Sequence, residues 1–176
     1  YPVQVVRSSE LSDGDRRSVW DIFARNMHDM YVQSSMGWDP ETKKAQLFHT
    51  DSRFILLRRP EPTASADGTE SLTLASFAMF RFDTEGGDRV VYCYELQIGH
   101  DCRRGGLGRA LMGMLYDIAK RCDMHKVMLT VFQMNEPAIS FYKSVGFQLD
   151  PISPGYEDDS EWIEEDEDYY IMSRTV

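Results

Sequence analysis

The sequence predicts a single α/β (α+β) domain built on one mixed, mostly antiparallel sheet with helices on its faces. The hydrophobic patterns follow the order helix, antiparallel strands, then strand, helix, strand, helix and strand, which is typical of this class. With 176 residues, 42% of them hydrophobic, the chain has the size of one domain, and we expect residues 1–176 to form it. Because the first residue is Tyr1 rather than Met, we also expect that a natural N-terminal extension is missing.

The first half of the chain is predicted to form two helices and then three strands. Residues 12–15 (SDGD) are the candidate N-cap region of an amphipathic helix that ends near Tyr31, because apolar residues follow them at three- and four-residue spacing. A short second helix opens at Asp39 or Glu41 and runs toward Phe48. Strands are predicted over 52–59, 71–82 and 90–98, with an exposed loop over 60–70 and a hairpin loop over 83–89.

The second half alternates helices with strands. Apolar residues trace one face of a long helix over 106–122, and its last turn carries Lys120 and Arg121, where positive charge is favourable. Residues 157–168 include nine acidic residues and are predicted to be a loop or a partly disordered insertion. The remaining predicted elements are strands over 127–132, 147–149 and 169–172 and a short helix over 137–143.

Composition narrows the function classes. No apolar run approaches the roughly 20 residues of a membrane-spanning helix, so we expect no membrane partner. The three cysteines lack CxxC spacing and the four histidines lack metal-ligand spacing, so no disulfide framework and no metal are predicted. A net charge of −10 disfavours direct binding of nucleic acid and suits a basic partner, although acidity that only maintains solubility would look the same.

The segment HDCRRGGLGR at 100–109 joins a predicted strand to the long helix. Free N–H groups and the helix dipole make such a helix start an anion site, and Arg103, Arg104 and Arg109 add positive charge. The segment matches neither the P-loop nor the GxGxxG dinucleotide fingerprint. It therefore indicates an anion site, with a simple tight turn as the alternative.

Two motifs in this region resemble a known family. Arg103-x-x-Gly106-x-Gly108 is similar to the [QR]xxGx[GA] signature of the GNAT acetyltransferases, in which this turn holds the pyrophosphate of coenzyme A. The segment NEPAISFYKSVGF at 135–147 resembles the family's other coenzyme-facing segment. The resemblance implies a GNAT fold, acetyl-CoA as co-substrate and acetyl transfer to an amine.

Four further segments resemble the N-terminal acetyltransferase D (NatD) family, whose members acetylate the N-termini of histone H4 and histone 2A. They are MYVQSSMGW at 30–38, FRFD at 80–83, YCYE at 92–95 and KVMLTVF at 126–132. This resemblance implies a basic protein N-terminus as partner and, with the cysteine usage, residence in nucleus and cytoplasm. We expect a monomer. The chain departs from the family at Met36, where an aromatic residue is usual.

Glu95 is the candidate general base, because a carboxylate inside the apolar strand VVYCYELQI needs a reason to be there. An ion pair with an arginine across the sheet is the alternative explanation. Strict alternation would put Tyr94 and Glu95 on opposite faces, whereas the β-bulge of GNAT enzymes would bring both toward the cleft. The resemblance adds Tyr31 as a second catalytic residue and Tyr142 as a candidate general acid. The alternatives are a half-buried aromatic for Tyr31 and a core residue of an apolar helix for Tyr142.

The resemblance also implies two sets of binding residues. Those for the coenzyme are Leu96, Gln97, Ile98, Arg104, Gly105, Gly106, Leu107, Gly108, Arg109, Thr130 and Asn135. Those for a Ser-Gly-Arg-Gly terminus are Tyr31, Asp83, Thr84, Glu85, Tyr94, Ser153 and Tyr169. Two further functions stay open, a GNAT enzyme acting on lysine or a small amine, and a module that binds acyl-CoA or a basic tail without turnover.

Overall fold

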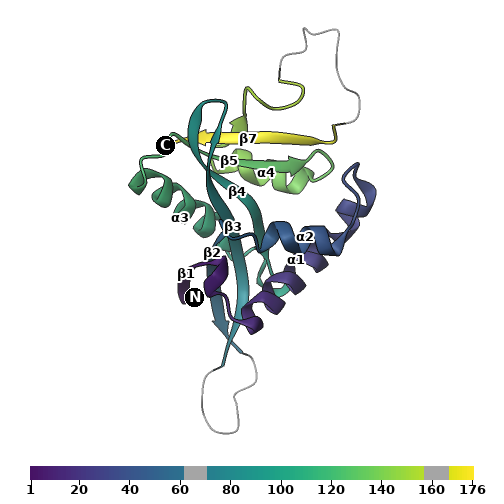
Figure 1. The fold of residues 1–176 in the computed structure, drawn as a ribbon, viewed down its shortest axis with the longest axis vertical. Coiled ribbons are helices and arrows are strands. Elements are labelled where there is room, and N and C mark those ends of the chain that lie inside the picture. The colour runs from purple at the N-terminus through teal and green to yellow at the C-terminus, as the bar shows by residue number, and fades with distance from the viewer. Residues whose placement is uncertain (62–70, 157–166) are drawn as a thin grey trace.

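The computed structural model describes residues 1–61, 71–156 and 167–176. Its centre is a seven-stranded mixed sheet in the order β1-β2-β3-β4-β5-β7-β6, in which β4 and β5 are parallel and the other neighbours antiparallel (Figure 1). The strands are β1 (Val3–Arg7), β2 (Arg53–Pro60), β3 (Leu72–Glu85), β4 (Asp88–Ile98), β5 (Lys126–Phe132), β6 (Gln148–Leu149) and β7 (Tyr169–Thr175). The predicted fold class is confirmed.

Helices cover both faces of the sheet. The α-helices are α1 (Asp13–Gln33), α2 (Pro40–Leu47), α3 (Leu107–Arg121) and α4 (Glu136–Ser144), and short 3-10 helices span Ser8–Glu10 and His100–Cys102. In β2, Phe54 packs into a core under α1 and α2, whereas the next residue, Ile55, packs into a second core under α3 and α4. This alternation follows from the two-residue period of a strand, and Figure 1 shows the helix pairs on opposite sides of the sheet.

Strand β1 was not predicted. Its residues are mostly exposed, and the strand is held by backbone pairing with β2, from Val3 opposite Leu57 to Arg7 opposite Arg53. An edge strand without a buried face gives no hydrophobic alternation to read, which is why the sequence did not reveal it.

The hairpin between β3 and β4 is tighter than predicted. Strand pairing continues to Glu85 opposite Asp88, so the loop consists of Gly86 and Gly87 alone, with φ of +56° and +86°. A two-residue turn of this kind needs positive φ at both positions, which glycine adopts without strain. Asp83 and Glu85 were predicted to lie in a loop. They lie instead at the end of strand β3, next to the turn.

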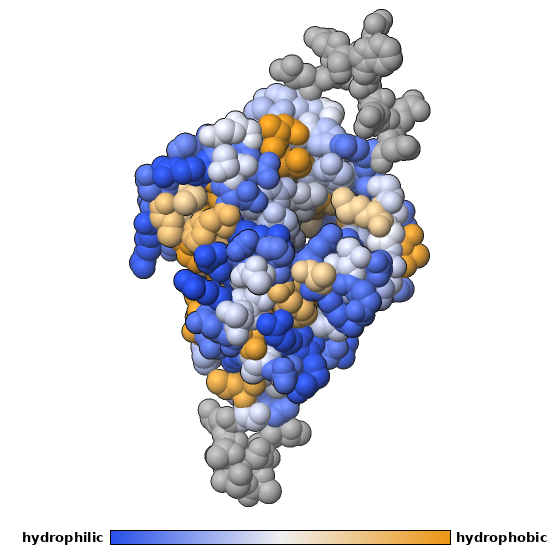
Figure 2. Space-filling view, in the orientation of Figure 1, coloured by the Kyte–Doolittle hydropathy of each residue, from blue (hydrophilic) through white to orange (hydrophobic). Residues whose placement is uncertain are grey.

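Much of the predicted loop over 60–70 and of the acidic segment 157–168 lies outside the described residues. In the described part of the chain, no helix combines the length and the apolar character that crossing a membrane requires. Figure 2 shows one face of the molecule as mostly hydrophilic, with small apolar patches separated by polar side chains.

Candidate active site

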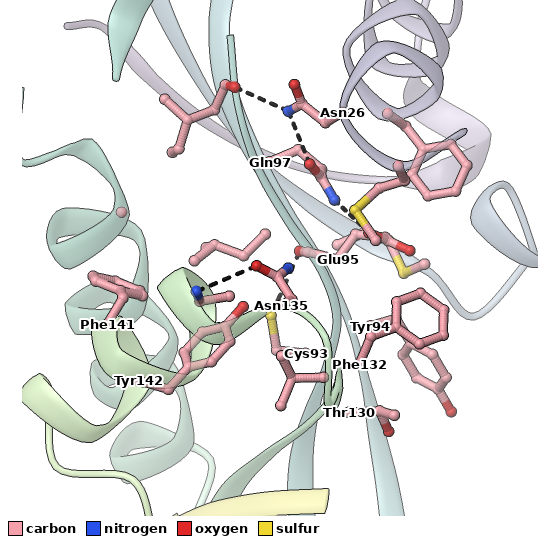
Figure 3. Close-up of a pocket in the computed structure, with 18 of the residues that line it drawn as sticks. Asn26, Cys93, Tyr94, Glu95, Gln97, Thr130, Phe132, Asn135, Phe141 and Tyr142 are labelled. Carbon is pink, nitrogen blue, oxygen red and sulfur yellow. Dashed lines mark hydrogen bonds between the residues drawn. The ribbon is translucent and has the colours of Figure 1, made fainter. Parts of the chain in front are cut away.

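A cleft forms where β4 and β5 separate. The two strands pair from Val90 opposite Lys126 to Cys93 opposite Leu129, and their pairing ends there. A cavity of about 1180 Å³ lies at this divergence and is lined by the second half of β4, the end of β5 and the starts of α3 and α4 (Figure 3). This volume suits a large ligand, and the separated strands leave main-chain groups to face it.

A β-bulge aims two side chains into this cavity. Met79 lies opposite Glu95 and Phe80 lies opposite Cys93, so Tyr94 is the extra residue of β4. Tyr94 and Glu95 both line the cavity, as a bulge allows and strict alternation does not. The hydroxyl of Tyr94 reaches the Asp83 carboxylate of the neighbouring strand at 3.5 Å.

The surroundings of Glu95 shift the pKa of its carboxyl in opposite directions. Burial raises the pKa of its carboxyl to about 7, although a hydrogen bond donated by Gln97 Nε2 at 2.8 Å and the charge of Lys43 both lower it. A carboxyl with this pKa exchanges protons near neutral pH, which is the property a general base needs. The alternative explanation, an ion pair with an arginine across the sheet, is not what the structure shows for Glu95.

Tyr31, near the end of α1, faces the same part of the cavity. Its ring packs edge-on against Phe132 at 5.0 Å between centroids, and Lys43 Nζ lies 3.9 Å from its centroid. Burial and then the charge of Glu95 raise the pKa of Tyr31 above its usual value. The phenol is therefore neutral at physiological pH, and it lines the same cavity as Glu95.

Tyr142 of α4 and Cys93 of β4 also line the cavity (Figure 3). Burial, followed by charge effects that include Glu95, raises the pKa of both groups well above the usual range. Cys93 is thus a buried thiol rather than a thiolate nucleophile. Tyr142 keeps its proton at neutral pH and has an O–H that is able to donate.

The turn before α3 has an open helix start. Ser12, Asp39 and Asn135 cap α1, α2 and α4 with their side chains, whereas Gly106 caps α3 without any side-chain hydrogen bond. Gly106 has φ of +79°, a conformation that suits glycine. The first N–H groups of α3 are thereby left for an anion, in a turn whose Arg103, Arg104 and Arg109 line the cavity.

Nearly all the predicted coenzyme residues line this one cavity, the exception being Gly105. Gly108 lets α3 approach α4, because a Cβ there would lie 3.2 Å from Phe141 Cζ. Thr130 and Asn135 also have ordinary structural partners. The Thr130 hydroxyl lies 2.5 Å from Tyr92 Oη, and Asn135 Oδ1 accepts a hydrogen bond from Ala138 N at 3.3 Å.

The predicted substrate residues are divided. Tyr31, Glu85, Tyr94 and Tyr169 line the cavity, whereas Asp83 and Thr84 are exposed at its hairpin rim. Ser153 is buried outside the lining, where its hydroxyl accepts a hydrogen bond from Ile171 N at 2.9 Å and donates one to Pro154 O at 3.2 Å. The hydroxyl of Ser153 thus makes its hydrogen bonds within the protein and joins the loop that contains it to β7.

Sequence reasoning missed four polar residues of the lining, Asn26, Lys43, Gln46 and Arg81. Asn26 lies three residues after buried Phe23 on the apolar face of α1, and a polar residue on such a face was a signal that could have been used. Lys43 lies four residues before buried Leu47 and is itself only 9% exposed. No local pattern distinguishes it from its exposed neighbour Lys44.

The fold, the open start of α3 and a buried carboxyl in a bulged strand define an acyl-CoA-dependent transferase. The Acetyltransferase (GNAT) family profile matches residues 19–147, and the chain belongs to this family. It is an acetyltransferase that uses acetyl-CoA as co-substrate. Among the described residues, no group of three His, Cys, Asp or Glu side chains is placed to hold a metal ion.

Solved structures of GNAT enzymes share the fold over nearly the whole chain. Arabidopsis thaliana NAA60 in complex with a bisubstrate analogue is 16% identical with a TM-score of 0.65, over 99% of this chain and 98% of that one. The Escherichia coli ribosomal-protein-S18-alanine N-acetyltransferase is 20% identical with a TM-score of 0.58, over 99% and 94%. The PaiA N-acetyltransferase of Thermoplasma acidophilum in complex with coenzyme A is 16% identical with a TM-score of 0.61, over all of both chains.

Proposed function

We propose that this enzyme has NatD activity: it transfers acetyl from acetyl-CoA to the free α-amine of proteins that begin Ser-Gly-Arg-Gly, as histone H4-like and histone 2A-like termini do. The observation that carries the proposal is Glu95, a carboxyl whose pKa is raised to about 7 at the divergence of β4 and β5. The sequence resemblance to N-terminal acetyltransferase D supplies the substrate class.

The pKa of Glu95 suits an α-amine better than a lysine. An α-ammonium has a pKa of about 7.7–8.0, about one unit above that of Glu95, whereas a lysine side chain has a pKa of about 10.4. Proton transfer to Glu95 is therefore only slightly unfavourable for an N-terminus and more than about a thousandfold unfavourable for a lysine. A modest base, acting directly or through one water, is sufficient for the first substrate.

The side chains around the cavity divide the reaction between them. Glu95 accepts the proton of the α-ammonium, and Tyr31 orders the amine or a relay water beside it. The neutral amine then attacks the thioester carbonyl carbon, a C–N bond forms, and the C–S bond breaks. Tyr142, which is protonated at neutral pH, gives a proton to the departing thiolate and takes up the second proton of the amine nitrogen as the amide forms. Catalysis otherwise depends on holding both substrates together.

A contact across one end of the cavity favours a chain terminus over an internal side chain. Ser35 follows α1 and donates two hydrogen bonds to Asp168 at the start of β7, from N to Oδ2 at 2.8 Å and from Oγ to Oδ1 at 3.1 Å. The residues next to this pair, Met36 and Tyr169, line the cavity. We infer that this contact between Ser35 and Asp168 closes one end of the cavity, which would suit a substrate that ends inside.

Two carboxylates at the hairpin rim suit an arginine at the third substrate position. Glu85 lines the cavity and Asp83 is exposed beside it, with the Tyr94 hydroxyl 3.5 Å from Asp83 Oδ2. Arginine pairs with carboxylates through fixed, often bidentate hydrogen bonds. A basic histone-like tail also complements the net charge of −10. Residence in nucleus and cytoplasm and a monomeric state accompany this proposal as predictions.

The test uses acetyl-CoA and the peptide Ser-Gly-Arg-Gly-Lys in two forms, one with a free N-terminus and one with that terminus blocked and the lysine free. We expect acetylation of the free terminus only, and Glu95→Gln should remove it. Activity on the blocked peptide would instead establish a lysine acetyltransferase. Activity on neither peptide, in a protein that still binds acetyl-CoA, would favour small amines or a binding module.

A further inference from the structure

A continuous chain of side-chain hydrogen bonds runs from the turn before α3 to Glu95. Arg103 Nη2 donates to Asn26 Oδ1 at 2.7 Å, Asn26 Nδ2 donates to Gln97 Oε1 at 3.0 Å, and Gln97 Nε2 donates to Glu95 Oε2 at 2.8 Å. Asn26 Nδ2 also donates to the main-chain oxygen of Ile98 at 3.0 Å. Figure 3 shows the part of this chain from Asn26 through Gln97 to Glu95.

The donors and acceptors in this chain of hydrogen bonds all run in one direction, because Arg103 at one end only donates and the Glu95 carboxylate at the other end only accepts. A guanidinium only donates, so Arg103 pairs with the oxygen of the Asn26 amide and leaves the amide nitrogen for Gln97. The oxygen of Gln97 is then used, and its NH₂ group faces Glu95. If the Gln97 amide were reversed, its oxygen would face the carboxylate. The chain therefore favours the ionised, proton-accepting form of Glu95.

The three donors come from three separate parts of the fold. Asn26 belongs to α1, Gln97 belongs to β4 and is 6% exposed, and Arg103 belongs to the turn that precedes α3. Asn26 is the link, because its amide joins the turn to the strand. A displacement of the turn is thus transmitted to the side chain that contacts Glu95.

We propose that Arg103, Asn26 and Gln97 are positioning residues, which orient Glu95 as a proton acceptor and connect it to the turn that receives the coenzyme pyrophosphate. The inference deepens the proposed function, since it rests on Glu95 as the base of acetyl transfer. None of the three residues needs to touch the reacting atoms for this role.

Other titratable groups also face Glu95 and have to be held constant. They are Lys43 on α2, Tyr31 on α1, Cys93 on β4 itself and Tyr142 on α4. All four stay in place when the chain of hydrogen bonds is interrupted elsewhere. A change in the titration of Glu95 in such variants then reports on the chain.

The experiment compares kcat/KM against pH for the wild type, Gln97→Met and Asn26→Asp, with acetyl-CoA and the free Ser-Gly-Arg-Gly-Lys peptide. Gln97→Met removes the donor to Glu95. Asn26→Asp keeps an acceptor for Arg103 but has no N–H for Gln97. Loss of one hydrogen bond to a charged group changes an acid dissociation constant by about tenfold. The kcat/KM below pH 7 should therefore fall about tenfold in both variants, and the acid limb of the pH profile should move to higher pH. Above about pH 9, where Glu95 is ionised in every variant, the loss should be small.

Two controls separate this role from a structural one. Arg17→Ala removes a positive charge from an exposed position of α1 and should leave the acid limb in place. Arg103→Ala should move it in the same direction as Asn26→Asp, and Arg103→Lys should restore part of the effect. A loss of activity that is equal at all pH values, or an unchanged acid limb in Gln97→Met, would overturn the proposal.

A second measurement does not depend on turnover. Carbon-13 NMR of glutamate-labelled protein follows the Glu95 carboxyl directly, with Glu95→Gln identifying its signal. We expect a higher Glu95 pKa in Gln97→Met and Asn26→Asp than in the wild type. If the enzyme acetylates no N-terminal peptide, this titration still tests the chain, so its failure and that of the proposed function are distinguishable. Unchanged titration in folded variants would refute the inference.

Discussion

The ammonium group of Lys43 lies 3.9 Å from the centre of the Tyr31 ring, so a residue of α2 and a residue of α1 hold one another beside Glu95. Lys43 is 9% exposed, and its pKa is lowered by burial although the charges of Glu95 and Asp39 raise it. This arrangement places a cation where it lowers the pKa of the Glu95 carboxyl and packs against the Tyr31 ring.

Lys43→Met should therefore impair the enzyme most at low pH. Without the positive charge the Glu95 pKa rises further, and the acid limb of kcat/KM moves to higher pH. A cation–π contact of about 0.5–2 kcal/mol is also lost, so the Tyr31 ring is held less firmly and kcat should fall several-fold. Steady-state rates at pH 6 and pH 9 measure both effects.

Lys44→Met is the matched control for this substitution. Lys44 is exposed, and its Nζ lies 5.0 Å from the Trp20 ring centroid. Its removal deletes the same side chain and charge from the same helix. We expect wild-type pH dependence, and an equal shift in both variants would show that net charge rather than position matters.

Glu95→Gln should lower activity and raise stability at the same time. Loss of a general base typically costs about 10² to 10⁴ in rate. The folded-state pKa of Glu95 is about 7 against a usual 4.5, so the native state binds more protons than the unfolded state in this window. Stability consequently falls as pH rises from about 4.5 to 7, and glutamine avoids that loss.

Denaturant unfolding at pH 5 and pH 8 measures this second effect. At pH 8 we expect the free energy of unfolding of Glu95→Gln to exceed that of the wild type by about 1 to 3 kcal/mol. The difference should shrink toward zero at acidic pH. A variant that is less stable at both pH values would contradict the raised pKa.

Glu85→Gln should change the recognition of arginine. Glu85 lines the cavity at the hairpin rim, and removing its charge should raise KM for Ser-Gly-Arg-Gly-Lys by about tenfold, the effect of one charged hydrogen bond. With Ser-Gly-Ala-Gly-Lys, both proteins should give the same KM. An equal KM change for the two peptides would exclude a contact between Glu85 and the arginine.

Local patterns in the sequence predicted most of the fold because the buried elements have clear periods. The apolar faces of α1 and α3 and the apolar runs of β2 and β3 were all readable, and so was the turn from Arg103 to Gly108. These patterns arise because apolar side chains are buried, and each pattern can be recognised from the residues of one helix or strand alone.

What the sequence did not reveal depends on contacts between elements. Lys43 enters the site only because α2 packs under α1, and Asn26 becomes a link only because Gln97 and Arg103 meet it across the fold. Ser153 was expected beside the substrate, but its hydroxyl is used by the backbone of β7. Residue type alone does not encode such partners.

Gly106→Ala and Gly113→Ala should have opposite effects on α3. Gly106 has φ of +79°, so alanine there is strained and distorts the turn that would bind pyrophosphate. Affinity for coenzyme A, measured by calorimetry, should fall together with stability. At Gly113, an exposed helical position where an added Cβ meets no atom within 4 Å, alanine should stabilise the protein by about 0.5–1 kcal/mol without weakening coenzyme binding.

Lys126→Met should destabilise the protein strongly. Lys126 Nζ lies 2.9 Å from Asp150 Oδ2 and 3.0 Å from Asp88 Oδ2, and the Asp150 side chain is only 1% exposed. Burial alone would raise the pKa of Asp150, but hydrogen bonds from Ser173, Lys126 and the Ile152 N–H lower it. Removing one partner of a buried pair leaves an uncompensated charge, which costs about 3–5 kcal/mol.

The pH dependence of this loss has a definite sign. With its folded pKa lowered, Asp150 contributes stability that is present above its usual pKa of 3.8 and is lost as pH falls through the lower folded value. Lys126→Met should therefore cost most at neutral pH and least in acid, as measured by urea unfolding at pH 7 and pH 3. Arg89→Met breaks the exposed Arg89–Asp123 pair of 2.7 Å and should cost less than about 1 kcal/mol at either pH. Equal losses in the two variants would show that burial of Asp150 does not govern the pair.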